Sequence, residues 1–255
     1  MPICFTKMHA MGNDVILAEA FSQRVYDPET LAIMLTDRTF GIGGEALVTV
    51  APCDGADARL TVCNADGTDA DPSGFAPFCA AKLLFDRGIV RGDSLTLSVG
   101  GERRGFRLAV PERRGVSGIC GKLPQPMRGE REEAEGLILH GVGELSVLLL
   151  DECFPDTASV ARVNLAAVAT KLGKARGAFL ITGETEDGTA EVRMWVPGKG
   201  ETRMRTDAVC AAAILLGGEK RTVRMTGGEV AVERSGEGLE LTAPVTTVFD
   251  GVTVI

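Results

Sequence analysis

The stretch NADGTDADPSGFAPFCAAKLL (residues 64–84) joins an acid- and glycine-rich turn to a short apolar segment that contains cysteine and alanine. A second stretch, GKGETRMRTDAVCAAAILL (198–216), follows the same plan in the other half of the chain. Runs of β-branched or alternating apolar residues lie on both sides of each stretch and predict strands. Because an apolar helix needs a sheet to bury it, the pattern indicates two related halves, each a curved sheet that buries one helix.

Three segments predict helices by their apolar spacing and their end residues. They are 28–38, where Pro28 lies early, 77–88, which ends at a glycine, and 207–218, where Asp207 is the expected N-cap. The polar stretch 123–136 is rich in Pro, Gly and Glu, and it predicts an exposed loop near a domain junction.

Composition narrows the function classes. The net charge is −8 and the pI is near 5.0, without a basic stripe, which argues against nucleic acid and anionic membranes as partners. No apolar run approaches the ~18–20 residues that span a bilayer. The seven cysteines are scattered without a CxxC pair, and there are only two histidines. A zinc site is therefore not expected. The cysteines are expected to be reduced thiols in a cytoplasmic protein.

The acidic turn after residue 63 has several interpretations. A calcium loop would need alternating acidic ligands and a glutamate at its twelfth position, but Gly67 follows Asp66 directly and the twelfth residue from Asn64 is Phe75. Asn, Asp and Gly are also common turn residues, and Asp71 or Ser73 could cap the next helix. The residues alone therefore favour a turn.

A set of motifs in a fixed order changes this balance. They are FTKMHAMGNDVIL (5–17), RTFGIGGEALVTV (38–50), NADGTDAD (64–71), RMWVPGKGET (193–202) and CAAA (210–213). Together they resemble diaminopimelate epimerase, a cofactor-independent amino-acid epimerase, over almost the whole chain. The resemblance implies an α/β (α+β) fold of two similar domains, each a curved, mostly antiparallel sheet or barrel around a central helix, with the active site in the cleft between them. The expected domains are 1–115 with 249–255, and 116–248.

The resemblance fails at the catalytic positions. In that family two cysteines face each other, one removing the α-proton and the other returning a proton. The matching positions here are Ser73 and Arg205. A thiol can cycle between acid and base near neutrality, whereas serine needs a neighbouring base and arginine cannot be deprotonated. Cys79 and Cys210 lie farther along the helices and are expected to pack, so diaminopimelate epimerisation is not expected.

The implied substrate site is only half retained. Asn13 and Asn64 match substrate-binding asparagines of the family. The helix starts that bind the substrate carboxylate through backbone N–H groups correspond to Gly74 with Phe75, and to Thr206.

The second half of the implied site is rewritten. The family's Glu-Arg pair corresponds to Val196-Pro197, a further substrate asparagine maps near Gly177, and Gly-Asn-Pro-His corresponds to residues 142–145. Trp195, in a predicted strand, is expected in the core.

Three residues are candidate catalytic groups. Glu45, beside apolar neighbours, could have a raised pKa, and related phenazine-biosynthesis isomerases use a single glutamate in the comparable strand. Asp207 is an acid–base group or a helix cap, and Ser73 is a ligand hydrogen-bond partner or a cap. Arg205 could clamp a substrate carboxylate, or pair with Asp207 or an aspartate across the cleft.

Two functions remain open. The first is a cofactor-independent isomerase or lyase that acts on a small carboxylate-bearing, amino-acid-derived substrate by single-residue acid–base chemistry, for which specialised metabolism is a natural setting. The alternative is a non-catalytic ligand-binding protein or a partner subunit of an active homologue. A homodimer is an open alternative, because that family often forms homodimers.

Overall fold

The computed structural model describes residues 2–70, 74–113, 115–173, 177–236 and 238–254. Its contacts divide the chain into two compact units, Met1–Lys122 with Thr242–Ile255, and Leu123–Leu241. The division falls within β7 (Val116–Pro124) and β16 (Gly238–Val254), two strands that run from one unit into the other. The expected boundaries at 115 and 249 lie just before β7 and within β16.

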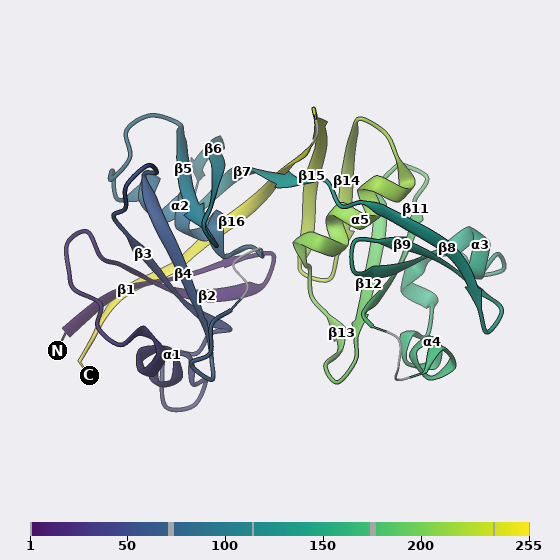
Figure 1. Cartoon of the computed structure of the whole chain (residues 1–255), viewed down its shortest axis with the longest axis horizontal. Helices are drawn as coiled ribbons and strands as arrows, with labels where there is room; N and C mark the ends of the chain where they lie inside the picture. Colours follow the sequence, from purple (N-terminus) through teal and green to yellow (C-terminus); the bar gives the residue numbers. More distant parts are fainter. Residues whose placement is uncertain (1, 71–73, 114, 174–176, 237, 255) are drawn as a thin grey trace. The chain divides into compact units, whose positions relative to one another are not determined.

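The first unit is a closed barrel of eight strands (Figure 1). The ring closes because β1 pairs with β2 on one side and with β16 on the other, so that Pro2 lies opposite Val254 and the two termini lie side by side. Its strands, in spatial order, are β1 (Pro2–Ala10), β2 (Asn13–Glu19), β3 (Ala46–Ala51), β4 (Ala58–Asn64), β5 (Ser94–Val99), β6 (Glu102–Arg113), β7 and β16.

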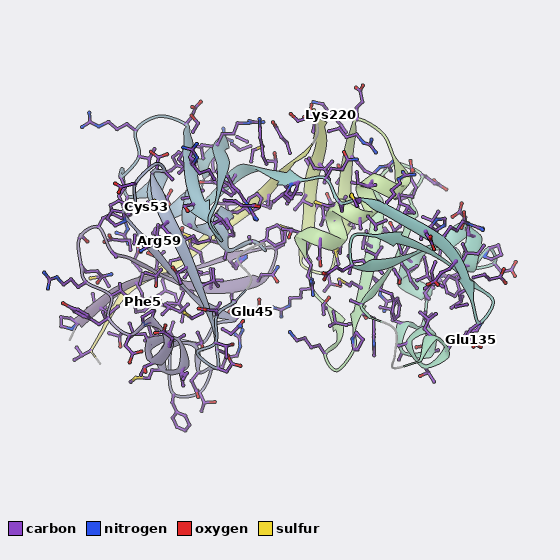
Figure 2. The ribbon with its side chains drawn as sticks, in the orientation of Figure 1. Phe5, Glu45, Cys53, Arg59, Glu135 and Lys220 are labelled. Atoms are coloured by element: carbon purple, nitrogen blue, oxygen red, sulfur yellow. The ribbon has the colours of Figure 1, made fainter. Side chains whose placement is uncertain are left out.

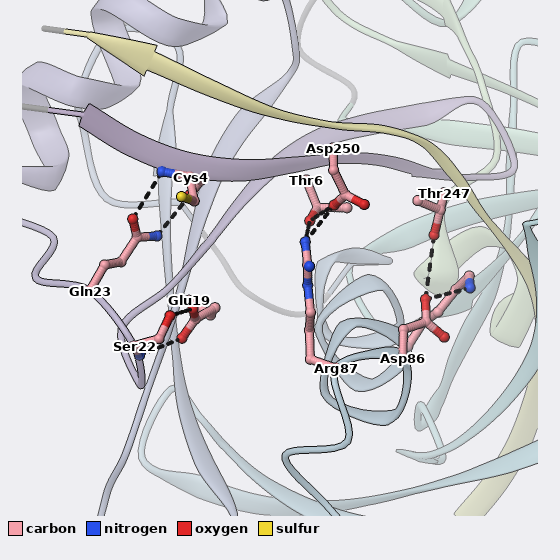
Figure 3. A network of polar contacts seen from close by, with 10 residues as sticks. Cys4, Thr6, Glu19, Ser22, Gln23, Asp86, Arg87, Thr247 and Asp250 are labelled. Carbon is pink, nitrogen blue, oxygen red and sulfur yellow. Dashed lines mark hydrogen bonds and ion pairs between the residues drawn. The ribbon is translucent and has the colours of Figure 1, made fainter.

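Helix α2 (Ala76–Asp86) fills this barrel and contacts β1 to β6. Its end is held by Arg87, which donates to Thr6 Oγ1 at 3.1 Å and to Asp250 Oδ1 at 2.5 Å, on β1 and β16 (Figure 3). Helix α1 (Pro28–Thr36) packs on the opposite face of β3 and β4, where Leu31 and Leu35 join a buried cluster. The sheet therefore has two distinct faces, one toward α2 and one toward α1.

The second unit is a sheet in the order β16-β15-β14-β12-β11-β10-β9-β8, with β13 beside β12. Helix α5 (Thr206–Leu216) contacts β10, β11, β12, β14 and β15, and most of its side chains are buried. A separate core cluster joins the sheet to η1 (Val160–Arg162) and α4 (Leu165–Leu172), near α3 (Leu150–Cys153). The strands are β8 (Arg128–Ala134), β9 (Leu137–Val142), β10 (Leu145–Leu149), β11 (Phe179–Glu184), β12 (Ala190–Val196), β13 (Gly200–Thr202), β14 (Lys220–Met225) and β15 (Gly228–Ser235).

The two units repeat one topology. In the first, β2 runs parallel to β3 and β4 parallel to β5, with α1 and α2 in the two connections. In the second, β10 runs parallel to β11 and β12 parallel to β14, with α4 and α5 in the corresponding connections. The neighbouring hairpins are antiparallel. The prediction of two similar halves, each a curved sheet around a central helix, is confirmed.

Two local predictions need correction, and one helix was missed. Residues 128–134 of the expected loop form β8, an exposed strand that pairs with β9. Helix α5 begins one residue before Asp207 and its N-cap residue is Arg205, because Arg205 has extended backbone angles and Thr206 is already helical. Helix α4 was not predicted, although Asn164 caps it by accepting from Ala167 N.

Candidate functional site

The retained first-half motifs meet at the ends of three adjacent strands. Asn13 begins β2, Glu45 directly precedes β3 and Asn64 ends β4. The register places Val15 beside Ala46 and Ala46 beside Asn64. We call this edge, defined by Asn13, Glu45 and Asn64, the β2–β4 rim. Figure 2 shows Glu45 at this end of β3 and β4, with Cys53 and Arg59 at the other.

Strand alternation divides the rim between the two faces of the sheet. Leu47 lies in the cluster that packs against α1, and residues two apart in a strand share a face. Glu45 is therefore on the α1 side, whereas Asn13 and Asn64 are on the α2 side. Glu45 is exposed, not enclosed by its apolar neighbours, and its N–H donates to Asp14 O at 2.8 Å.

A partly buried ion cluster ties the rim together on the α1 side. Lys7 Nζ donates to Asp14 Oδ2 at 2.6 Å and also to the carbonyl oxygen of Gly43. Arg38 donates to the two Asp14 oxygens at 2.7 and 3.1 Å. Burial acts to raise the pKa of Asp14, but hydrogen bonds and charges from Arg38 and Lys7 outweigh it and lower the pKa. The pKa of Arg38 is raised by the Asp14 hydrogen bond and charge, and also by the charge of Glu45.

The two asparagines of the β2–β4 rim form hydrogen bonds with groups that lie close to them in the sequence. Asn64 Nδ2 donates to Thr68 Oγ1 at 3.0 Å and to Asp69 O at 3.2 Å. Asp66 accepts from the N–H and hydroxyl of Thr68, so the acidic segment is a turn as the residues alone suggested. Asn13 Nδ2 donates to Ala10 O at 3.2 Å across the β1–β2 turn.

The start of α2 is more apolar than the resemblance implied. Phe75 occupies the N-cap position and is buried, with its ring centroid 5.7 Å from that of Phe78. A Cβ added at Gly74 would meet no atom of the described residues within 4 Å. Ser73 and Asp71 lie outside the described residues.

The start of α5 carries a closed ion pair. Arg205 donates from Nε to Asp207 Oδ1 at 3.0 Å and from Nη2 to Oδ2 at 2.5 Å. Asp207 Oδ1 also accepts from Ala208 N. Both side chains are half exposed, and Thr206 between them is buried. The pairing of Arg205 with Asp207, one of the alternatives from sequence, is the one observed.

The two helix cysteines are unsuited to proton transfer. Burial raises the pKa of Cys79 to about 12, although the charge of Lys82 opposes the shift. Burial, with a contribution from the charge of Asp207, raises the pKa of Cys210 to about 12. A thiol in this range carries almost no thiolate near neutrality, so both cysteines act as packing residues.

Across the described ranges, no group of three His, Cys, Asp or Glu side chains is arranged to hold a metal ion. The same residues contain no helix that is both long and apolar enough to cross a bilayer.

Sequence reasoning missed the ion cluster of Lys7, Asp14 and Arg38. All three lie within motifs that carry the family resemblance, FTKMHAMGND and RTFGIGGE. A buried lysine needs an acidic partner, so the alternation of β1, which turns Lys7 toward the α1 face, was the available signal. Trp195, expected in the core, is only half-buried.

Comparisons with known proteins agree with this architecture. Diaminopimelate epimerase of Methanococcus maripaludis is 29% identical, over 97% of this chain and 98% of its own length. A phenazine biosynthesis protein of the PhzF family from Enterococcus faecalis has a TM-score of 0.74 at 13% identity, with both chains fully covered. A probable proline racemase from Agrobacterium radiobacter has a TM-score of 0.65 at 14% identity, covering 99% of this chain and 92% of its own. No family model matches the chain.

The similarity to epimerases supports the interpretation of this chain as an isomerase-type enzyme. The solved structures share the fold of this chain. The resemblance predicted from the motifs is confirmed over nearly the whole length. The chain is similar to diaminopimelate epimerases over nearly its whole length.

Proposed function

We propose that this protein is a cofactor-independent isomerase that moves a proton on a small carboxylate-bearing metabolite by single-residue acid–base chemistry. The observation that carries the proposal is the β2–β4 rim, which presents Glu45 as an exposed carboxylate beside Arg38 on an isomerase fold. A carboxylate suits transfer of a proton on one face of a substrate, and it does not require a second residue opposite.

The proposed substrate class rests on each helix start taken by itself. No atom of the described residues lies within 4 Å of a Cβ added at Gly74, which supports the approach of a ligand to the backbone at the start of α2. Arg205 at the start of α5 is half exposed, and its planar guanidinium fits a carboxylate in two hydrogen bonds. We therefore propose an amino-acid-derived or unsaturated carboxylic acid in a cytoplasmic, specialised pathway, and not diaminopimelate, because both thiol positions are changed.

Two observations favour a second candidate, a ligand-binding protein or partner subunit without catalysis. Phe75 is buried at the start of α2, and Arg205 is already engaged by Asp207. In that case the helix starts keep their shape but no group removes a proton.

Deuterium incorporation separates the two candidates. The full chain is incubated in deuterium oxide with pools of amino acids and of unsaturated carboxylic acids, and mass shifts are read. An isomerase labels one substrate, Glu45→Gln abolishes the labelling, and Glu19→Gln, a carboxylate at the far end of β2, leaves it unchanged. Labelling that survives Glu45→Gln contradicts the role of Glu45, and the absence of labelling in every pool favours the non-catalytic candidate.

A further inference from the structure

The ion cluster on the α1 side of the β2–β4 rim contains one more cation than it has carboxylates. Lys7 and Arg38 both donate to Asp14. The pKa of Asp14 is lowered in this contact, so its carboxylate is ionised near neutrality and balances one of the two positive charges. Lys7 is buried, whereas the side chain of Arg38 is 61% exposed. The charge that Asp14 leaves unbalanced is therefore accessible to a ligand at Arg38.

The hydrogen bonds to Asp14 leave one edge of the Arg38 guanidinium free. Nη1 and Nη2 donate to the two oxygens of Asp14 at 3.1 and 2.7 Å, so the contact uses the end of the guanidinium. The lateral edge, formed by Nε and the second hydrogen of Nη2, has no acceptor among the residues that the structure describes. Such an edge binds a carboxylate through two parallel hydrogen bonds.

His9 lies on the other side of Asp14. The register of β1 and β2 places His9 directly opposite Asp14, and facing Cβ atoms in such a pair are about 4.5–5.5 Å apart. Phe5 of the same strand belongs to the buried cluster under α1, and residues at intervals of two share a face, so His9 is also on the α1 side. His9 is half-buried, and its Nδ1 is enclosed without a hydrogen-bond partner in the described part of the chain.

The enclosed Nδ1 indicates which nitrogen of His9 carries the hydrogen. A neutral imidazole has one N–H, and the other nitrogen is an acceptor. A buried N–H without an acceptor is tolerated less readily than a buried acceptor without a donor. The hydrogen is therefore expected on Nε2, which makes His9 a hydrogen-bond donor at that nitrogen.

We propose that Arg38 and His9 bind a carboxylate group of the substrate beside Glu45. Arg38 supplies two hydrogen bonds and the unbalanced charge, and His9 supplies a third hydrogen bond from Nε2. The N–H of Glu45 donates to the carbonyl oxygen of Asp14, so Glu45 lies one strand away from the bound carboxylate. Because adjacent strands are about 4.8 Å apart, the carbon that exchanges its proton lies within a few bonds of the carboxylate, as in a 2-amino acid or an α,β-unsaturated acid. The inference rests on the proposed function for the role of Glu45 and on the ion cluster for the site.

Crotonate and crotonamide test the site, because the two molecules have nearly the same shape and only crotonate is charged. His9 and His140 are the only histidines of the chain, so proton–nitrogen correlation spectra of the full chain contain two sets of imidazole signals, which His140→Gln assigns. We expect crotonate to shift the His9 signals saturably and to leave the His140 signals in place. Crotonamide should bind at least about tenfold more weakly. The same spectra identify the nitrogen of His9 that carries the hydrogen.

Matched arginine variants locate the binding. Arg38→Gln removes the cation and should weaken crotonate binding at least about tenfold. Arg38→Lys keeps the charge but not the planar edge, so its affinity should lie between those of Arg38→Gln and wild type. Arg59→Gln changes an exposed arginine near the opposite end of β4 (Figure 2) and should leave binding unchanged. Melting curves establish that each variant is folded, and Arg38→Lys tests the site by itself if Arg38→Gln does not fold.

Failure of the two proposals can be told apart, because binding is measured without turnover. Saturable crotonate binding that the folded Arg38 variants weaken supports the site even if no acid exchanges deuterium. Unshifted His9 signals, equal shifts of His9 and His140, equal binding of crotonate and crotonamide, or wild-type affinity in the folded Arg38 variants overturns the site. A hydrogen on Nδ1 overturns the role of His9. None of these outcomes contradicts the proposed function, which the deuterium assay of Glu45→Gln tests separately.

Discussion

Replacement of Lys7 by methionine tests whether the ion cluster fixes the rim that carries Glu45. The Lys7 side chain is 10% exposed, and its Nζ donates to Asp14 and to the carbonyl of Gly43. Methionine keeps most of the buried aliphatic stem, so the cost is set by the lost polar contacts. A hydrogen bond between charged groups contributes about 1.5–3 kcal/mol, and an unsatisfied buried carbonyl costs about 1–3 kcal/mol. Allowing for relaxation, we expect Lys7→Met to lower the free energy of unfolding by about 2–4 kcal/mol.

Urea denaturation of the full chain measures this loss. The matched control is Lys220→Met, because Lys220, labelled in Figure 2, also pairs with a carboxylate, that of Glu233. Its side chain is 74% exposed. An exposed ion pair contributes only about 0–1 kcal/mol. If Lys7→Met costs no more than Lys220→Met, the cluster does not stabilise the rim as argued.

Acid provides an independent check on the same cluster. The pKa of Asp14 is lowered in the folded protein, so the group contributes stability that is present above the unfolded pKa of about 3.9. That contribution is lost as the pH falls through the lower, folded pKa, where the carboxyl becomes protonated. The difference in unfolding free energy between wild type and Lys7→Met should therefore shrink below about pH 4, while the loss at Gly43 remains. A constant difference over this range would mean that the Lys7–Asp14 pair contributes little.

Two further results are expected. Phe78→Ala should cost about 3–5 kcal/mol in urea denaturation, because the ring is fully buried within the barrel; a cost under about 1 kcal/mol would contradict the packing of α2. Burial raises the pKa of Cys79 and Cys210 to about 12, so both thiols should resist iodoacetamide in the native protein at pH ~8. The exposed Cys4 should react under the same conditions, and peptide mass spectrometry measures the labelling of each cysteine. Rapid labelling of either buried thiol would reopen thiol chemistry.

Local sequence signals predicted the helices but not all of their surroundings. The apolar spacing and terminal glycines of 77–88 and 207–218 placed α2 and α5 to within two residues at each end. Strand β8 was missed because its side chains are exposed or half-buried, so the sequence has no apolar alternation to mark it. The N-cap of α5 was misplaced because Asp207 suits that position by type, while the backbone angles of Arg205 decide where the helix begins.

The candidate site depends on contacts that no local pattern contains. The motifs indicated that Asn13, Glu45 and Asn64 belong together, and the register of β2, β3 and β4 places them on one rim. The sequence did not show that strand alternation turns Glu45 to the face opposite the asparagines. It also gave no sign that Arg38 and Asp14, distant in the chain, flank Glu45.

The hydrogen bonds at the start of α5 bear on which residue can be the acid–base group. Both Asp207 oxygens are held by Arg205, and one also accepts from Ala208 N. Arg205 uses Nε and Nη2 for this contact, so Nη1 and the second Nη2 hydrogen are the donors that remain for a ligand carboxylate. Both oxygens of Asp207 are occupied by the same contact, which disfavours Asp207 as the group that removes a proton. On the rim Asp14 is held ionised by two cations, which leaves Glu45 as the acid–base residue we propose.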